Sequence, residues 1–476
     1  MTGDDSPAES APPGPGDPAA FRDLHDREPG LFAVAVLTLG VGLATRVLVR
    51  FLPAYLRALG AGPAAVGVVW SGWRLARLAA PYLDDPAVAV ESRLAAGDRW
   101  PGDALADLRD RFDLREGYAA ALEPTGEADG SDSRYVVAGF GLLTGLGYLL
   151  WVAAPQLGPV GSFPLTVGPW AWTLAGAACL ATWYSHGPGA AFRIAERRLP
   201  TGAVARRLAA ARTFRRVGVL AGLPVLALVF AGVGAVGPAF QLASAGAASL
   251  AAAAAVGRAV LDPDDGTDVP DRDGGREPPR LDRVLADLRG LSGDDRALAL
   301  ADGLVRVGRG LCCPFLVLAV ADFGLGGAVL GITVGPAALF AGLLAAETLG
   351  ALLAAAPVAR LTDRVGVDPV VGGGCLVVSL FPLALAAAPS ATAAAGLFAG
   401  FGVGVAARPF RRELLVCVGR NCGDSAAASL RLAGRAAGVA SPLAGGALYA
   451  VSPTLAFGLA TAVCLLGCRE FLRYAR

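Results

Sequence analysis

Long apolar stretches alternate with short polar connections along almost the whole chain after residue 30. Each stretch is long enough to cross a hydrocarbon core of ~30 Å at about 1.5 Å per helical residue. The pattern predicts an all-α integral membrane protein with twelve transmembrane helices, at 31–52, 63–83, 135–154, 164–184, 214–231, 237–258, 298–320, 336–356, 369–388, 391–410, 427–450 and 453–471.

Arginine is distributed unevenly between these connections. The connections after odd-numbered stretches carry little charge, and Arg57 is the one basic residue of the first. Connections after even-numbered stretches are basic, and include Arg193, Arg197, Arg198, Arg206, Arg207, Arg212, Arg360, Arg364, Arg411, Arg412 and Arg420. Because cationic connections remain on the cytoplasmic side, both termini are predicted to be cytoplasmic, in a multi-pass protein of the cell membrane.

The composition agrees with a membrane protein and narrows its function. Hydrophobic residues make up 54% of the chain and charged residues 17%, whereas a soluble protein has about a quarter charged. A net charge of +1 gives no basis for nucleic-acid binding. The chain contains no lysine and therefore no Walker lysine, so a built-in P-loop ATPase is excluded. We expect no enzyme active site, no cofactor and no metal site, and we interpret the cysteines within apolar stretches as small hydrophobic residues.

The polar segments divide the chain into parts. We predict a disordered cytoplasmic tail, an N-terminal half with six helices, a cytoplasmic linker and a C-terminal half with six helices, at 1–30, 31–258, 259–297 and 298–476. A cytoplasmic insert at 85–134 contains a plausible helix near 102–121. We favour a solvated appendage for this insert over a regulatory docking element. The linker contains an Asp-Asp-x-x-Asp pattern at 264–268, which its Pro- and Gly-rich surroundings mark as a solvated tract and not as a magnesium–diphosphate site.

The two halves share short patterns at equivalent positions. In the first and seventh helices a glycine, two arginines and a proline follow one another: Gly42, Arg46, Arg50, Pro53 and Gly303, Arg306, Arg309, Pro314. In the fifth and eleventh helices the shared residues are Gly218, Gly222, Pro224 and Gly434, Gly438, Pro442. Small residues at helical spacing let helices approach closely in lipid. Two such matches indicate an internal duplication.

The connection after the eighth helix resembles the loop signature of the major facilitator superfamily, Gly-x-x-x-Asp-Arg-x-Gly-Arg. Asp363, Arg364 and Gly366 match it, whereas Ala359 and Val367 replace the first glycine and the last basic residue. After the second helix only Asp84 or its neighbour Asp85 corresponds to the signature. The resemblance implies two pseudo-symmetric six-helix bundles that work by alternating access. It also implies a gating role for the loop Asp and Arg, with helix capping as the alternative interpretation.

Arginines inside the apolar stretches are candidate functional residues, because a charge at membrane depth is costly. In the fold that the resemblance implies, Arg46 and Arg306 face each other across a central cavity. Two guanidiniums there would bind a carboxylate or phosphate, and Arg74, Trp70 and Trp73 would line the path. Under the alternative interpretation, Arg50, Arg77 and Arg309 extend to the membrane interface, and Arg46 or Arg306 pairs with Glu347.

Glu347 is the one carboxylate that we place well inside a predicted span, since Asp302, Asp322 and Glu413 fall near helix ends. It lies near the membrane midplane if its helix starts at Pro336, and lower if the helix starts near Ala328. We consider two roles, a proton carrier and a structural partner of a nearby arginine.

These observations predict a secondary active transporter for a small-molecule substrate, working as a monomer in the lipid bilayer. A coupling ion, either a proton or sodium, is a further candidate partner. An organic anion held by Arg46 and Arg306 is the favoured substrate class. The alternatives are proton-coupled multidrug-type efflux, a sensor built on a transport fold, and a membrane enzyme acting on a lipid or isoprenoid.

Overall fold

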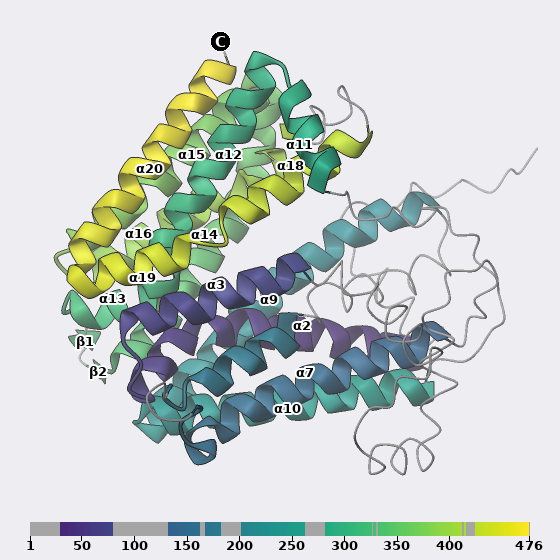
Figure 1. Ribbon diagram of the computed structural model, residues 1–476, viewed down its shortest axis with the longest axis vertical. Coiled ribbons are helices and arrows are strands. Elements are labelled where there is room, and N and C mark those ends of the chain that lie inside the picture. Colours follow the sequence, from purple (N-terminus) through teal and green to yellow (C-terminus); the bar gives the residue numbers. More distant parts are fainter. Residues whose placement is uncertain are drawn as a thin grey trace, which may run out of the picture.

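The computed structural model describes residues 29–79, 132–161, 167–181, 201–261, 281–325, 327–329, 332–411, 414–415 and 424–475. Within these ranges the chain is almost entirely helical (Figure 1). The one sheet of the described residues is a short antiparallel pair, β1 (Gly327–Val329) and β2 (Ile332–Val334). Most of the predicted tail, the insert helix near 102–121, Asp84 and the Asp-rich tract at 264–268 lie outside the described residues.

The N-terminal half is a bundle in which α10 packs against both α7 and α2. Its described helices are α2 (Pro29–Ala58), α3 (Pro63–Ala79), α7 (Asp132–Leu157), a shorter helix at Ala171–Ala181, α9 (Thr201–Val233) and α10 (Val236–Leu261). The Tyr55 hydroxyl donates to the carbonyl of Trp151 at 2.6 Å, and its ring stacks on Phe240 at 4.4 Å. These buried contacts explain why α2 continues past Pro53 to Ala58 instead of ending near residue 52 as predicted.

The C-terminal half is a second bundle, in which α12 packs along α20 and α14 along α16. Its elements are α11 (Leu281–Gly290), α12 (Gly293–Cys312), η2 (Cys313–Phe315), α13 (Leu316–Asp322), α14 (Pro336–Val365), α15 (Val367–Ala386), α16 (Ala391–Ala406), α18 (Asp424–Ala437), α19 (Ser441–Val451) and α20 (Pro453–Tyr474). Proline or glycine interrupts two of the predicted spans. Pro314 lies in the 3-10 turn between α12 and α13, and the predicted span at 427–450 breaks between α18 and α19, just before Pro442.

The seventh helix begins earlier than the sequence pattern predicted. Ser292 caps α12, and its hydroxyl accepts from the Asp295 backbone N–H. Two acidic residues in the first turn favour this start by interacting with the positive end of the helix dipole. The segment predicted as linker therefore contains α11 and the first turn of α12.

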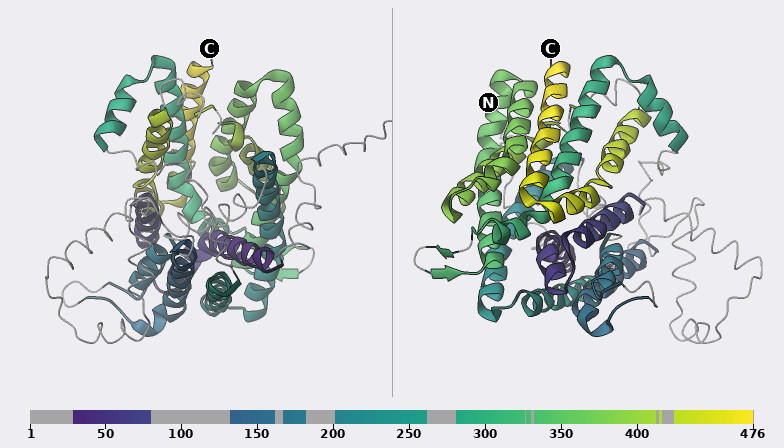
Figure 2. Two further views of the ribbon diagram at one scale, coloured as in Figure 1. Left: turned by 90° about the vertical axis from the view of Figure 1, so that its right-hand side faces the viewer. Right: turned by 60° about the vertical axis from the view of Figure 1, so that its left-hand side comes forward.

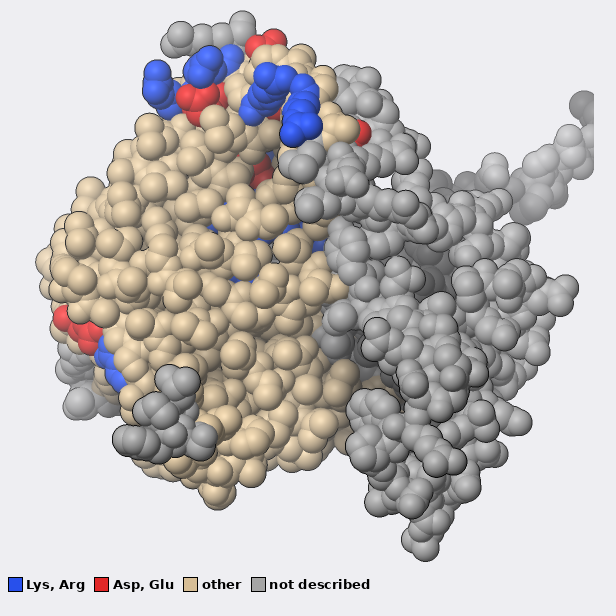
Figure 3. Space-filling view, viewed as in Figure 1, with Lys and Arg blue, Asp and Glu red and all other residues tan. Residues whose placement is uncertain are grey.

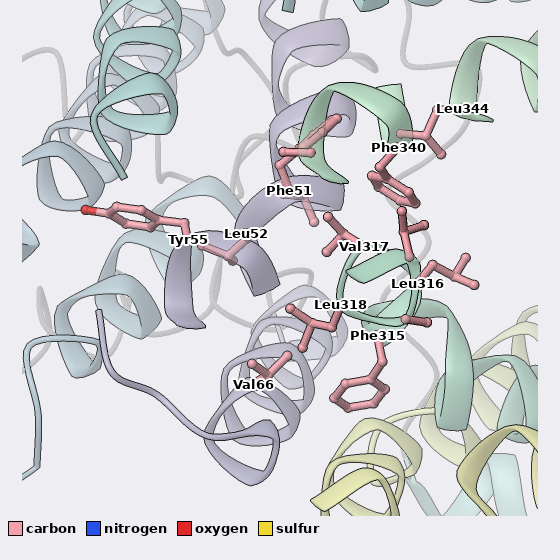
Figure 4. Packing of buried hydrophobic residues seen from close by; sticks show 14 of the residues in the cluster. Phe51, Leu52, Tyr55, Val66, Phe315, Leu316, Val317, Leu318, Phe340 and Leu344 are labelled. Carbon is pink, nitrogen blue, oxygen red and sulfur yellow. The ribbon is translucent and has the colours of Figure 1, made fainter. Parts of the chain in front are cut away.

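The two bundles meet at one end and diverge away from it (Figures 1 and 2). Where they meet, α2 and α3 contact η2, α13 and α19, and α9 packs along α14. The contact is apolar: Phe51 lies edge-on to Phe340 with ring centroids 5.3 Å apart, beside Leu316 and Val317 (Figure 4). Burial of these side chains, at about 1.5–3 kcal/mol each, holds this end of the molecule closed.

The outer surface has the character of a membrane protein. In the view of Figure 3, charged side chains gather at the end that carries the C-terminus, with a smaller group at the opposite end, and a wide uncharged surface lies between them. Within the described residues, seven helices are long and apolar enough to cross a membrane, and three shorter apolar helices accompany them. The fold is therefore that of a multi-pass membrane protein.

Candidate functional site

A cavity of about 380 Å³ lies between the two halves. Four helices line it. Its polar and aromatic lining comes from α2, α3 and α14, and consists of Arg46, Arg50, Trp70, Trp73, Arg74, Arg77, Glu347 and Thr348. Apolar residues of α2, α9 and α14 complete the wall. The volume falls in the range of about 300–1,000 Å³ that is typical of small-molecule sites.

Helix α2 brings Arg46 and Arg50 to the cavity because residues four apart share one face of a helix. Another face is buried against α10 and reaches α7 through hydrogen bonds. There the Thr45 hydroxyl lies 2.5 Å from the Tyr148 hydroxyl and donates to the Val41 carbonyl at 2.8 Å. This packing fixes the rotation of α2 about its axis and so directs both guanidiniums toward the other half.

Glu347 supplies the carboxylate of the cavity. Helix α14 begins at Pro336, the first of the two starts considered above, because β1 and β2 pair as strands before it instead of forming a helical turn. The Glu347 side chain is buried, with its Oε1 3.5 Å from Arg50 Nη2. Its other oxygen is buried and has no hydrogen-bond partner among the described residues. The structure thus pairs Glu347 with Arg50, and not with Arg46 or Arg306.

Arg74 joins the two halves across the cavity wall. Its Nη1 donates to the Gly438 carbonyl at 2.5 Å and to the Ser441 hydroxyl at 3.1 Å. Both acceptors lie where α18 ends and α19 begins, so the guanidinium caps the negative end of the α18 dipole. A Cβ atom on Gly310 would overlap the Ser441 hydroxyl and lie 2.7 Å from Arg74 Nη1, so glycine makes room for this junction.

Two tryptophans form the aromatic part of the wall. Trp70 and Trp73 pack edge to face with ring centroids 5.2 Å apart, and the Arg77 guanidinium lies 5.4 Å from the Trp73 ring centroid. The buried indole nitrogen of Trp70 has no hydrogen-bond acceptor within the described part of the chain. The cavity therefore combines flat apolar surface with polar groups.

The cavity is strongly basic. Among the described lining residues, four guanidiniums and one carboxylate give a formal charge of +3. In a confined site of low dielectric, such a charge attracts an anion, and guanidinium binds carboxylate or phosphate through two parallel hydrogen bonds. The described residues contain no group of three or more His, Cys, Asp or Glu that could hold a metal ion.

Arg306 does not line this cavity, so the structure does not bring the predicted pair of Arg46 and Arg306 together. Arg306 Nε instead donates to Asp302 Oδ2 at 2.5 Å, one helical turn away. Arg411 Nη2 approaches the other oxygen of Asp302 at 3.1 Å. Asp302 is only 4% exposed, which corrects its predicted place near a helix end.

The earlier start of α12 explains the error on Asp302. Because Ser292 caps α12 and the helix begins at Gly293, Asp302 is the tenth of its 20 residues and lies well inside it. The signal was present in the sequence, since Ser292-Gly293-Asp294-Asp295 has the Ser-x-x-Asp spacing of a helix start before an apolar run.

The loop signature lies at the junction of α14 and α15. Asp363 and Arg364 are exposed in the last turn of α14, and α15 starts at Val367. Gly366 has φ of +90°, a conformation that favours glycine, and so allows this tight turn between two helices. A gating role for Asp363 and Arg364 stays a prediction.

A polar cluster that the sequence analysis did not identify closes the end where the halves meet. Arg57 at the end of α2 donates two hydrogen bonds to the Asp322 carboxylate, at 2.8 and 2.7 Å. The Tyr449 hydroxyl of α19 donates to the same carboxylate at 2.8 Å. The signal available in the sequence was the isolation of Arg57 and Asp322 as charges in connections that otherwise carry few.

Comparison with solved structures identifies the fold. A point mutant of the nucleoside transporter NupG superposes with a TM-score of 0.64 at 11% identity, covering 94% of this chain and 100% of that chain. A point mutant of the peptide transporter POT, in complex with sulfate, superposes with a TM-score of 0.62 at 13% identity, covering 94% of each chain. A POT family transporter in complex with 5-aminolevulinic acid gives 0.58 at 11% identity, covering 94% of this chain and 96% of that chain.

No family model and no curated protein sequence matches the chain. The likeness therefore concerns the fold, because the identities are 11–13%. It confirms a helical membrane fold shared with these transporters, whereas two six-helix bundles with twelve spans stay a prediction.

Proposed function

We propose that this chain, which has the fold of major facilitator superfamily transporters, is a secondary active transporter that moves a small organic anion across the cell membrane by alternating access. The two halves enclose a central cavity and meet at only one end, an arrangement that suits a rocking motion around a fixed site. The carrying observation is the formal charge of +3 on a cavity of about 380 Å³ between the halves.

The proposed topology has twelve spans with both termini in the cytoplasm. The two spans beyond the apolar helices are α3, which carries Arg74 and Arg77, and the interrupted pair α18 and α19. A broken helix is tolerated at membrane depth where it lines a cavity or is buried in protein. The end at which the halves meet then faces outside, and the cavity in this state faces the cytoplasm.

The proposed ligand is a carboxylate or phosphate compound of small-metabolite size. Arg46 and Arg50 would hold the anionic group, and the faces of Trp70 and Trp73 would contact the rest of the molecule. The sulfate and 5-aminolevulinic acid in the complexes of two solved transporters of this fold support an anionic ligand without naming it.

Glu347 is the proposed coupling residue. An anion that binds Arg50 competes with the Glu347 carboxylate, which lies 3.5 Å from Arg50. A carboxylate that loses its cation in a buried site binds a proton more readily. Coupling to protons therefore predicts that Glu347→Gln abolishes proton-driven uptake in liposomes while counterflow exchange of the anion persists. Equal loss of both activities would contradict the coupling role.

The binding test measures thermal unfolding of the purified protein in detergent against a panel of carboxylates, phosphates and lipophilic drugs. Selective binding to the folded state raises the melting temperature. An anion that stabilises the wild type and Arg473→Ala, but not Arg46→Ala, supports the proposal. Arg473 is a suitable control because it pairs with Glu470 on an exposed face of α20, outside the cavity.

Efflux of lipophilic compounds is the second candidate, favoured by the tryptophans and the apolar residues of the wall. Efflux of this kind predicts that lipophilic compounds alone stabilise the protein and that Arg46→Ala transports fully. Either result would contradict the anion proposal. The sensor alternative depends on the insert at 85–134, and loses its support if transport persists after deletion of that insert. The membrane-enzyme alternative requires paired carboxylates or histidines in the cavity, and among the described lining residues Glu347 is the one such group.

A further inference from the structure

A second, much smaller cavity lies inside the C-terminal half. Its volume is about 20 Å³, and it shares no lining residue with the cavity between the halves. Three arginines line it, Arg309 from α12 and Arg408 and Arg411 from the span that contains α16. The remaining lining consists of small or apolar residues of α12, α15 and α16, together with Cys375.

Each of these arginines has a buried nitrogen without a hydrogen-bond partner among the described residues. The atoms are Arg309 Nε, Arg408 Nη2 and Arg411 Nε. Arg309 also lies over the Phe401 ring, 5.6 Å from its centroid, and the thiols of Cys313 and Cys375 are near Arg309 and Arg411. Thiols are weak acceptors, so they do not satisfy charged donors. Unsatisfied buried cationic donors are costly, and such atoms call for an explanation.

The acidic residues nearby do not balance this charge. Asp302 is shared between Arg306 and Arg411. Glu347 interacts electrostatically with Arg309 and Arg408, but its ion pair is with Arg50 in the other cavity. Counting Arg50 and Arg306, five guanidiniums therefore depend on two carboxylates among the described residues.

The size of the cavity selects the kind of anion. A volume of about 20 Å³ is small, and a monatomic anion is the kind that needs least room in it. A carboxylate, phosphate or sulfate has three to five heavy atoms and needs more. Gly374 and Gly404 fix its dimensions, because a Cβ on Gly374 would lie 2.6 Å from the Ala407 Cβ, and one on Gly404 would lie 3.0 Å from the Gly374 carbonyl.

We propose that Arg309, Arg408 and Arg411 bind a single halide ion, chloride under physiological conditions, within the C-terminal half. The ion accepts from the unpaired guanidinium nitrogens and offsets their charge. It is bound separately from the transported molecule and stabilises the bundle in which it lies.

The test uses the full-length protein in detergent, unfolded by heat in sodium chloride or in sodium gluconate at equal ionic strength. Gluconate is too large for the small cavity. Because its carboxylate belongs to the class proposed to bind between the halves, both salts are also compared in Arg46→Gln, which weakens that second site. We expect a melting temperature higher by about 2 °C or more at chloride concentrations ten times the dissociation constant, saturating with concentration, with bromide replacing chloride. Equal melting temperatures in chloride and gluconate would overturn the proposal.

Two variants locate the effect. Arg408→Gln should abolish the difference between chloride and gluconate, and Arg46→Gln, in the other cavity, should retain it. A full halide response in Arg408→Gln, or its loss in Arg46→Gln, would place the ion elsewhere and reject the site. If Arg408→Gln does not fold, anomalous diffraction from wild-type crystals grown in bromide decides: a peak among the three arginines supports the site, and its absence there rejects it.

Discussion

Helices α2 and α12 occupy equivalent places in the two halves and carry the same sequence of residue types, yet their arginines lie in different environments. Arg46 and Arg50 of α2 line the cavity between the halves. Arg306 of α12 pairs with Asp302, and Arg309 lines the small cavity within its own bundle. The same pattern therefore contributes to the cavity between the halves in one case and to the interior of the bundle in the other.

The arginines are shifted relative to the glycine and the proline, the first by one residue and the second by two, since Arg50 precedes Pro53 by three residues and Arg309 precedes Pro314 by five. The glycine and the proline are eleven residues apart in both patterns, but Arg46 precedes its proline by seven residues and Arg306 precedes its proline by eight. One residue rotates a side chain by about 100° around a helix of 3.6 residues per turn. The position equivalent to Arg46 is therefore Val307. Sequence likeness between the two halves predicts where helices form. The exact spacing of an arginine within its helix decides which residues its side chain contacts.

The largest expected effect is on thermal stability and follows from substitution of Asp302. Its carboxylate balances buried charges that both belong to the C-terminal half. Asp302→Ala leaves Arg306 and Arg411 without their shared carboxylate, and breaking a buried ion pair costs about 3–5 kcal/mol. We expect a large fall in the melting temperature of the purified protein. Asp363→Ala, at an exposed helix end, is the matched control and should change it little. Comparable melting temperatures for the two variants would show that Asp302 does not balance these charges.

Arg46 and Arg306 offer a direct test of the shifted spacing. For any anion found to stabilise the protein, Arg46→Gln should weaken binding by a factor of about ten or more, through loss of a charged hydrogen bond worth roughly 1.5–3 kcal/mol. Arg306→Gln should leave affinity within about twofold, because Arg306 lies outside the cavity. Isothermal titration of both variants measures the difference. Equal losses would mean that the two arginines act on one site after all.

The repeated glycines provide a smaller contrast. A Cβ on Gly434 would lie 3.0 Å from Asp302 Oδ2 and 3.2 Å from Arg306 Nε, and so would press on an ion pair. A Cβ on Gly218, the equivalent position in α9, would meet only the flexible end of Leu43. We expect Gly434→Ala to cost about 1–3 kcal/mol and Gly218→Ala clearly less. Thermal unfolding of both variants measures the ranking, and the reverse order would contradict it.

The smallest expected effect is at the end where the halves meet. Arg57 and Asp322 are partly exposed, and exposed ion pairs contribute only about 0–1 kcal/mol. Arg57→Gln should therefore shift the balance between open and closed forms by no more than about fivefold. Distances between spin labels placed on either side of this end measure the two populations. A complete change to the open form would mean that the polar cluster, and not the apolar packing around Phe51, holds the end closed.

The apolar pattern was sufficient to predict a helical membrane protein, because a span of lipid imposes a minimum length on each apolar stretch. It also grouped Arg46, Arg74, Trp70, Trp73 and Glu347, all of which line one cavity, although their role in binding stays a prediction. Helix ends were less predictable. Hydropathy marks where a chain enters lipid, and the caps and buried contacts that extend α2 and α12 lie beyond that boundary.

Contacts between distant helices were outside the reach of sequence reasoning. Arg411 was assigned to a cytoplasmic connection, but its side chain turns inward and is 13% exposed because Asp302 lies within reach. The break at the eleventh span was likewise missed. Pro224 leaves α9 continuous, whereas the equivalent segment ends α18 at Ala437. The prolines differ in spacing, since Pro224 follows Gly222 by two residues and Pro442 follows Gly438 by four.

Because of the break between α18 and α19, Arg74 has two interactions that its donors cannot make at the same time. Its guanidinium holds the free carbonyl of Gly438 in the opposite half, and the same guanidinium forms part of the basic wall that faces a bound molecule. Every movement that draws α3 away from the turn between α18 and α19 must break these hydrogen bonds, at a net cost of about 1.5–3 kcal/mol for a charged donor. A ligand that takes over the donors of Arg74 removes much of that cost. In the proposed mechanism, occupancy of the cavity and separation of the halves would thereby be thermodynamically linked through one side chain.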